Sequence, residues 1–262
     1  MMNRPYRRLL HSLDNHGVNG MVLRAFDRLL GKPGRNEIRN RPGAMIHPFD
    51  VQYGVETSGY LPGEQLPSGS PADLYNTAYY GIAPSALTQA LWLLPPRVDR
   101  STFLDLGCGK GRALLVAAQF PFRQITGIEL SPALCRIAAR NTASDPRISV
   151  RQGDATTLQF PRTPLLVYLY HPFLAAGLRR VLTNLERSFD EQPREIYLLR
   201  ANPVYPKLVK RLRFLEPVWD YSFPLSAEDA AADRHGIRFE RFTLFRACPY
   251  GPVAEAGEQA PQ

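Results

Sequence analysis

From Thr102 onward the chain alternates short apolar runs with segments of helical composition, and this alternation limits the possible folds more than any other feature. Buried strands are predicted at residues 102–106, 124–130, 147–152, 165–170 and 195–200. Helices are predicted between and after them at residues 110–120, 133–141, 174–189 and 206–213. A regular succession of strand and helix produces a parallel sheet with helices on both faces. The sequence therefore predicts an α/β domain that begins near Thr102.

The remaining segments extend this domain at both ends. Residues 214–221 and 237–247 are predicted to form two last strands, the second with strictly alternating side chains. The sequence predicts three parts, which are an amino-terminal helical and loop extension with a possible lid (1–95), the α/β domain (96–248) and a disordered tail (249–262).

The amino-terminal extension carries the clearest charge asymmetry. Residues 1–50 contain nine Lys and Arg against four Asp and Glu, which is +5 of the total net charge of +8. Apolar side chains at three- and four-residue spacing predict a helix over residues 18–29, with Arg24 and Arg28 off the apolar stripe. Such a helix is either a solvated face or a docking surface for nucleic acid, an anionic membrane surface or an acidic protein.

Cysteine content and hydropathy indicate the compartment. The three cysteines, Cys108, Cys135 and Cys248, are far apart and form no CxxC pair, so neither a disulfide framework nor a metal site is predicted. No apolar run reaches the eighteen or more residues of a membrane span, and the first residues lack the pattern of a signal peptide. We expect a cytoplasmic protein in a reducing environment.

The turn after the first predicted strand, FLDLGCGKGR, is the main candidate ligand site. Its glycines, Gly107, Gly109 and Gly111, allow positive φ and close approach of a ligand to the backbone. A phosphate loop of the GxxxxGK[ST] kind is excluded, because Lys110 is followed by glycine. A dinucleotide loop, GxGxxG, is weakened but stays open, because the third glycine arrives one residue early.

Three carboxylates decide between the possible ligands. Asp105 lies at the entrance of the turn, where it would repel a diphosphate by a few kcal/mol and attract an ammonium group. Glu129 ends the second strand, where an acidic side chain can accept both hydroxyls of a ribose. Asp154, after the third strand, can accept a hydrogen bond from the amine of adenine. An ammonium, a ribose diol and an adenine amine together describe S-adenosylmethionine.

These motifs, DLGCGKGR, GIEL and QGDA, resemble the first three cofactor motifs of class I S-adenosylmethionine-dependent methyltransferases, in the right order and spacing. The resemblance implies a Rossmann-like, doubly wound sheet of seven strands, mostly parallel, with an antiparallel last strand. It implies that backbone groups around Gly107 hold the methionine part, that Glu129 binds the ribose, and that Asp154 and the Ala155 N–H bind adenine. The expected cofactor-binding residues are Asp105, Gly107, Cys108, Gly109, Glu129, Leu130, Asp154 and Ala155.

A closer resemblance concerns the acceptor side. The stretches FDVQYGVETSG, LYHPF and RANP are similar to those of uncharacterised bacterial methyltransferases that usually carry Asn-Pro-Phe, a group distantly similar to the non-SET histone lysine methyltransferases. Here His171 replaces the Asn. It is either a catalytic group that accepts a proton from the nucleophile or a hydrogen-bonding replacement for Asn. Tyr170 and Phe173 complete the predicted catalytic set, with Phe173 as a pocket wall or a core residue.

Residues outside these motifs are also placed near the cleft. Asn202 follows the fifth strand, Tyr79 is expected to close over the methionine part, and Glu56 and Thr57 lie on a loop that could form the lid. Each of them is otherwise a packing or surface residue.

The sequence therefore predicts methyl transfer from S-adenosylmethionine to an unidentified acceptor, with a protein side chain or a small molecule favoured over RNA. Two alternatives stay open. One is a nicotinamide-dependent oxidoreductase, and the other is a non-catalytic nucleoside-binding module that docks a partner through its basic amino-terminal helix.

Overall fold

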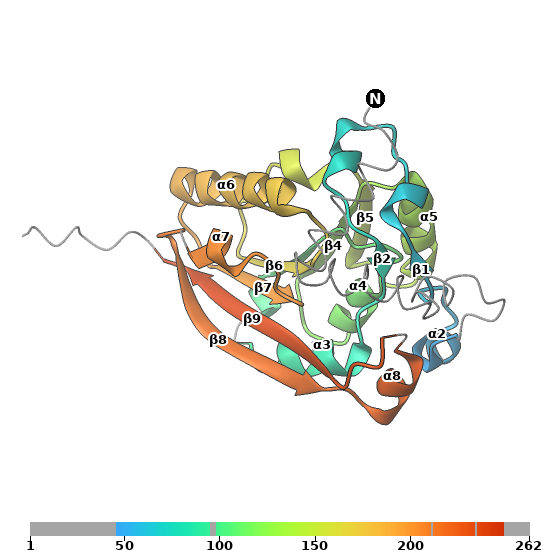
Figure 1. Ribbon diagram of the computed structural model, residues 1–262. Helices are drawn as coiled ribbons and strands as arrows, with labels where there is room; N and C mark the ends of the chain where they lie inside the picture. Colours follow the sequence, from blue (N-terminus) through green and yellow to red (C-terminus); the bar gives the residue numbers. More distant parts are fainter. Residues whose placement is uncertain (1–45, 95–97, 211, 234, 249–262) are drawn as a thin grey trace, which may run out of the picture.

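The computed structural model describes residues 46–94, 98–210, 212–233 and 235–248 (Figure 1). Its strands are β1 (Tyr60–Leu61), β2 (Tyr79–Tyr80), β3 (Thr102–Leu106), β4 (Gln124–Glu129), β5 (Ile148–Gln152), β6 (Leu165–Tyr170), β7 (Ile196–Ala201), β8 (Leu215–Pro224) and β9 (Phe239–Ala247). Its helices are α2 (Pro48–Tyr53), α3 (Pro84–Trp92), α4 (Arg112–Ala117), α5 (Pro132–Asn141), α6 (Ala175–Glu191), α7 (Pro206–Lys210) and α8 (Ala227–Ala232).

Seven of the strands form one sheet in the order β5-β4-β3-β6-β7-β9-β8. The pairs from β5 to β7 are parallel, whereas β9 is antiparallel to both of its neighbours. The predicted fold class, a doubly wound and mostly parallel sheet with an antiparallel last strand, is therefore confirmed. The chain leaves β3 toward β4 and β5 and returns to β6 on the other side. This change of direction makes the carboxyl end of β3 the topological switch point, where open α/β sheets bind ligands.

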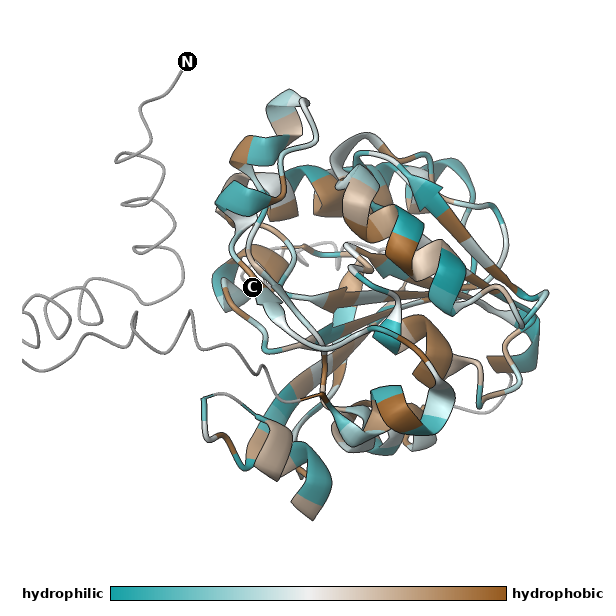
Figure 2. Ribbon diagram, turned by 90° about the vertical axis from the view of Figure 1, so that its right-hand side faces the viewer, coloured by the Kyte–Doolittle hydropathy of each residue, from teal (hydrophilic) through white to brown (hydrophobic). Residues whose placement is uncertain are grey.

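Helices cover both faces of the sheet. On one face, α3 and α4 pack against apolar residues that include Phe103, Ile125 and Phe242. On the other face, α6 and α7 pack against a second set that includes Leu104 and Val167. The helices show alternating brown and teal bands in Figure 2, as expected when only one side of a helix is buried. Successive residues of β3 therefore point to opposite cores, and Asp105 lies on the α3–α4 face with Phe103.

The predicted element boundaries agree with the structure to within a few residues, with one informative exception. The helix predicted over residues 110–120 begins only at Arg112 and ends at Ala117. Gly111 has φ +87°, a left-handed conformation outside the helical region, so the glycine turn is longer than the pattern indicates. The helix predicted over residues 18–29 and the tail over 249–262 lie outside the described residues.

Candidate active site

A single cavity with about 890 Å³ of empty space, partly open to solvent, lies at the carboxyl end of β3. All eight predicted cofactor-binding residues line it: Asp105, Gly107, Cys108, Gly109, Glu129, Leu130, Asp154 and Ala155. Tyr170 and Phe173 line it as well, whereas His171 does not. The fold thus brings together residues that are separated by up to 68 positions in the chain.

The floor of the cavity is the glycine turn, whose backbone leaves no space for side chains. Gly107 has φ +83°, and a Cβ built there would lie 2.5 Å from Cβ of Pro172. Gly109 has φ +57°, and its Cβ would overlap the ring of Tyr79. The turn therefore contacts two segments that close the cavity, the end of β6 and β2. Both positions require glycine for conformational and steric reasons.

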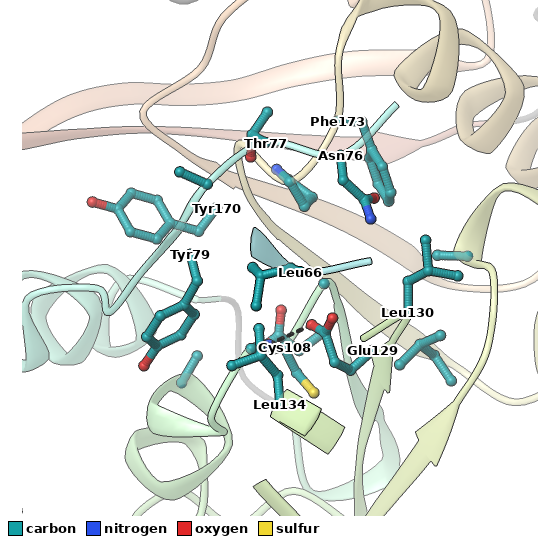
Figure 3. A pocket seen from close by; sticks show the side chains of 18 of the residues that line it. Leu66, Asn76, Thr77, Tyr79, Cys108, Glu129, Leu130, Leu134, Tyr170 and Phe173 are labelled. Carbon is teal, nitrogen blue, oxygen red and sulfur yellow. Dashed lines mark hydrogen bonds between the residues drawn. The ribbon is translucent and has the colours of Figure 1, made fainter. Parts of the chain in front are cut away.

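Glu129 is held by backbone N–H groups at the end of β4. Its Oε2 accepts from the Gly109 N–H at 2.8 Å (Figure 3). Its Oε1 accepts from the Ser131 N–H at 2.8 Å. Burial raises the pKa of Glu129, and the backbone hydrogen bonds lower it in part. The carboxylate is thus fixed in orientation, and each oxygen still has lone-pair capacity for a further donor.

Asp105 lies deeper and has no such support. Its side chain is 2% exposed, and burial together with the negative charge of Glu129 raises the pKa of Asp105 well above its ordinary value. No hydrogen bond contributes to lowering it. Beside it on β6, the buried hydroxyl of Tyr168 has no hydrogen-bond partner among the described residues. The base of the cavity therefore contains a carboxyl group and a hydroxyl group that lack protein partners.

Asp154 marks the third wall, after β5. Its Oδ1 accepts from the Thr156 N–H at 2.8 Å and so caps a short 3-10 helix, Ala155–Thr157. The first N–H groups of a helix have no acceptor within the helix, which leaves the Ala155 N–H available in principle to a ligand. Both the structural role and the predicted ligand contact are therefore compatible with this geometry, since a carboxylate can accept from several donors.

The residues of the YHPF motif, which was predicted to lie on the acceptor side, line two different cavities. Tyr170 and Phe173 face the main cavity, as Figure 3 shows, and Pro172 packs on the glycine turn. The His171 backbone has φ +46°, and its side chain lines a second, smaller cavity with Arg200 and Asn202. The His171 carbonyl accepts from Oγ1 of Thr77, a residue that lines the main cavity, at 2.7 Å.

The second cavity is surrounded by backbone in an uncommon conformation. Among the described residues, the three non-glycine positions with positive φ are His171, Asn202 and Tyr205. Asn, Asp and His adopt the left-handed conformation more readily than other non-glycine residues, which is a physical reason why His171 can occupy this position. Arg200 donates to the Val204 carbonyl there, and burial lowers the pKa of Arg200 to about 10.

Sequence reasoning missed most of the cavity roof. Residues 76–82, together with Leu66 and Ala72, line the main cavity from above. Asn76 forms an isolated antiparallel bridge with Phe173, and the Leu174 N–H donates to the Tyr75 carbonyl at 2.7 Å. We call residues 75–77 the strap. Its sequence, YNT, has no periodicity or motif, so nothing in the local pattern could have indicated this pairing.

The loop predicted as a lid lies behind the glycine turn instead of over the cavity. Thr57 is fully buried, accepts from Arg112 Nε at 2.6 Å and donates its N–H to Asp50 Oδ2 at 2.7 Å. Glu56 contacts Lys110 Nζ at 3.1 Å. The Tyr79 hydroxyl donates to the Thr57 carbonyl at 2.5 Å. This loop therefore fixes the glycine turn and the Tyr79 ring from outside, and neither Glu56 nor Thr57 lines the cavity.

With this geometry established, the chain was compared with known proteins. Residues 103–190 match the family model described as a methyltransferase domain. This methyltransferase-domain match begins in β3 and ends in α6, so it includes the glycine turn, Glu129, Asp154 and the YHPF motif. The strap and β9 lie outside it.

Individual relatives match over shorter or more distant stretches. The chain is 39% identical over 66 residues to a trans-aconitate 2-methyltransferase of Methylobacterium radiotolerans, covering 25% of this chain and 24% of the relative. It is 27% identical over 145 residues to ribosomal RNA small subunit methyltransferase A of a Synechococcus strain, covering 50% and 51%. The chain thus spans about a quarter and about half of the length of these two relatives. The N-methyltransferase NodS of Bradyrhizobium japonicum superposes with a TM-score of 0.48 at 17% identity, covering 63% and 96%.

The described residues contain neither a helix suited to span a membrane nor a cluster of metal ligands. No helix in the described ranges combines the length and hydropathy needed to cross a bilayer. In the same ranges, no group of three or more His, Cys, Asp or Glu side chains is arranged to hold a metal ion.

Proposed function

We propose that this protein transfers a methyl group from S-adenosylmethionine to an acceptor that enters beside Tyr170. The observation that carries the proposal is the pair of buried acids, Asp105 and Glu129, on either side of the glycine turn in one cavity. Neither acid forms an ion pair with a basic side chain of the protein in the described part of the chain. The methyltransferase-domain match over residues 103–190 supports the same assignment.

The residues present fit this cofactor. Asp105 is a buried carboxyl group with no hydrogen-bond or ion-pair partner among the described residues, and an ammonium group would supply one. Gly107 and Gly109 leave the backbone bare where the methionine part would lie. Glu129 would accept from the ribose hydroxyls, and Asp154 with the Ala155 N–H would bind adenine. A dinucleotide would instead bring two further negative charges toward Asp105, which disfavours the nicotinamide alternative.

When bound, the cofactor supplies a methyl group on a sulfonium, whose carbon–sulfur bond breaks as the bond to the acceptor forms. The sulfonium is already reactive, so the protein contributes mainly by orienting the two reactants and excluding water. The strap and Tyr79 cover the cavity and perform that exclusion. Acid–base assistance is needed only when the acceptor must lose a proton.

Calorimetry with S-adenosylhomocysteine tests the proposal directly. We expect binding at about micromolar strength. A bound ammonium favours the ionised form of Asp105, so binding at a pH below the raised pKa of Asp105 is expected to release a proton. Proton release is measured from the change in binding heat between buffers of different ionisation enthalpy. We expect this release to be absent in Asp105→Asn and to persist in the exposed control Asp190→Asn.

Two results would contradict the assignment. One is the absence of any heat with wild-type protein at concentrations that saturate known binders. The other is quenching of the fluorescence of reduced nicotinamide dinucleotide by the protein, which would favour the oxidoreductase alternative. Methyl acceptors are then sought by incubating the protein and labelled donor with an extract of its host that retains its small molecules, and by asking whether label enters protein, small molecules or RNA.

A further inference from the structure

Tyr170 and Glu240 are 70 positions apart in the chain but meet beside the main cavity. Because β9 is antiparallel to β7, its first residues lie beside the carboxyl ends of the parallel strands. In the sheet register Tyr170 lies opposite Ala201, and Ala201 lies opposite Phe242. Glu240 is two residues before Phe242 and therefore on the same face as Tyr170. The Tyr170 hydroxyl donates to Glu240 Oε2 at 3.4 Å.

A second tyrosine–acid pair lies beside the first. The Tyr80 hydroxyl donates to Asp233 Oδ1 at 2.9 Å. Tyr80 and Tyr170 both line the main cavity, while the two acids lie behind them. Figure 3 shows Tyr170 and Tyr79 along one side of the cavity, opposite Glu129 and Leu130. The side of the cavity away from the ribose-binding acid is thus lined by phenols that are backed by carboxyl groups.

Among the described residues, no basic side chain forms an ion pair with Glu240. Its side chain is 5% exposed, and burial, followed by the negative charge of Asp233, raises the pKa of Glu240 to about 7, which the hydrogen bond from Tyr170 lowers only in part. Among the described residues, the ionisable groups that interact with Glu240 are Asp233, Tyr168 and Tyr170. Tyr80 and Asp233 also interact with Tyr170. The adjacent Arg241 is paired instead with Asp220, at 2.6 Å. An acid buried in this way for packing alone would be costly, because no opposite charge in the described part of the chain stabilises it.

Tyr170 can transfer a proton between two neighbouring groups while its own phenol stays neutral. Burial and the charge of Glu240 raise the pKa of Tyr170 well above its ordinary value, so the phenol stays neutral. A neutral phenol can donate to Glu240 and accept from a second group at the same oxygen. The unpartnered hydroxyl of Tyr168, two residues earlier on the same face of β6, offers a further polar contact in the same cavity.

We propose that Tyr170 and Glu240 form a proton relay that takes a proton from the methyl acceptor, whose nucleophilic atom therefore carries a proton at neutral pH. This inference rests on the proposed methyl transfer. The bond between the nucleophile and its hydrogen breaks as the proton moves to Tyr170 Oη, and the proton of Tyr170 moves to Glu240 Oε2. Glu240 becomes a neutral carboxylic acid, and the nucleophile keeps the electron pair that attacks the methyl group. Tyr170 touches the acceptor, while Glu240 acts through Tyr170.

The relay defines a substrate class. Alkylammonium groups and hydroxyl groups carry a proton that must leave, whereas thioethers and tertiary amines do not. The labelled product separates the two permitted groups, because hot hydriodic acid releases an O-methyl group as volatile methyl iodide and leaves an N-methyl group in place.

The first test follows Glu240 itself in the full-length protein labelled with carboxyl-¹³C glutamate. We expect one resonance, assigned by its loss in Glu240→Gln, to titrate with a midpoint of about 7. Tyr170→Phe is expected to raise the midpoint, and Asp233→Asn to lower it, because these groups act on Glu240 in opposite directions. A wild-type midpoint at the ordinary glutamate value would overturn the relay.

The second test measures initial rates of methyl incorporation into host extract that retains its small molecules, from about pH 5.5 to 8.5. The wild-type rate is expected to rise with pH through the midpoint of Glu240, because only the ionised form accepts a proton. Glu240→Gln and Tyr170→Phe are expected to lose tenfold or more in rate at neutral pH and to lose this rise. Glu195 is an exposed acid directly before β7, at the end of the strand away from the cavity. The control variant Glu195→Gln is expected to behave as wild type.

Binding of S-adenosylhomocysteine separates the possible failures. Glu240→Gln and Tyr170→Phe are expected to keep an affinity within twofold of wild type. If they bind normally and retain the wild-type rate and pH profile, the relay is wrong and methyl transfer stands. If wild-type protein binds the nucleoside but labels nothing, or does not bind it, the proposed function itself is contradicted.

Discussion

The main cavity lies at the carboxyl ends of the parallel strands, and the buried acids on its two sides have different hydrogen-bond partners. On the β4 half, Glu129 is held by two backbone N–H groups at 2.8 Å. On the β9 half, Glu240 is buried with one hydrogen bond, at 3.4 Å, and a second acid nearby. The backbone donors fix the orientation of Glu129, whereas burial and the neighbouring acid raise the pKa of Glu240 to about 7. This difference agrees with the two roles proposed above, ligand binding on the β4 half and proton transfer on the β9 half.

The largest effect is expected where the two halves touch. Gly107→Ala places a methyl group 2.5 Å from Pro172 and requires a left-handed alanine. Strain and overpacking together are expected to cost about 2–6 kcal/mol of stability. Thermal unfolding and S-adenosylhomocysteine binding measure the loss. Gly153→Ala is the matched control, since its nearest neighbour would be Ile128 at 3.9 Å. Equal behaviour of the two variants would show that the halves are not in close contact.

The next largest effect is a pH-dependent gain of stability. Glu240 keeps its proton in the folded protein up to about pH 7, while the unfolded chain loses it near 4.5, so stability falls as pH rises between these values. Glu240→Gln removes this loss and is expected to stabilise the protein by up to about 3 kcal/mol at pH 8, with little effect near pH 4. Denaturant unfolding at the two pH values checks it, with Glu195→Gln as control. A destabilised variant at pH 8 would show that Glu240 is a structural anion.

A smaller effect is expected on the binding half. Glu129→Ala removes the acceptor for two backbone N–H groups and for the ribose hydroxyls, and it is expected to weaken S-adenosylhomocysteine at least tenfold, about 1.4 kcal/mol. Calorimetry measures the affinity, and Glu240→Gln is the internal comparison because it is expected to bind normally. The distinction between the halves fails if Glu240→Gln weakens binding as much as Glu129→Ala does.

The smallest effect concerns the strap. Thr77→Val removes the hydrogen bond to the His171 carbonyl, at 2.7 Å, and is expected to cost about 1 kcal/mol. Hydrogen exchange of the Leu174 N–H, which donates to Tyr75, is expected to speed up in this variant. Thr157→Val, which removes an exposed hydrogen bond of the same kind, is the control. An unchanged exchange rate would mean that the strap is held by its backbone pairing alone.

The sequence predicted the β3–β5 half well for a physical reason. The glycine turn, Glu129 and Asp154 are each defined by their place directly after a strand, and parallel strands bring such places to one edge. The same strand and helix periodicity therefore predicted both the fold and which residues line the cavity at the ends of β3, β4 and β5.

The other half depends on contacts between distant segments. Tyr80, Tyr170 and Glu240 belong to three separate elements, and their meeting follows from the insertion of β9 between β7 and β8. No local pattern encodes that placement. His171 shows the same limit from another side, since its identity indicated chemistry while its positive φ turns the side chain into the second cavity. Its role as a catalytic group stays a prediction.

The position of β9 also has a consequence for biosynthesis. Within the sheet, β8 is hydrogen-bonded only to β9. Residues 215–224 therefore have no strand to pair with until residues 239–247 have been synthesised. A nascent chain still lacking its last strand has no β9 beside β7, lacks the buried core residues Phe242 and Leu244, and cannot place Glu240 beside Tyr170. Under the proposed function, the residue that receives the acceptor's proton would therefore be among the last to reach its place during synthesis.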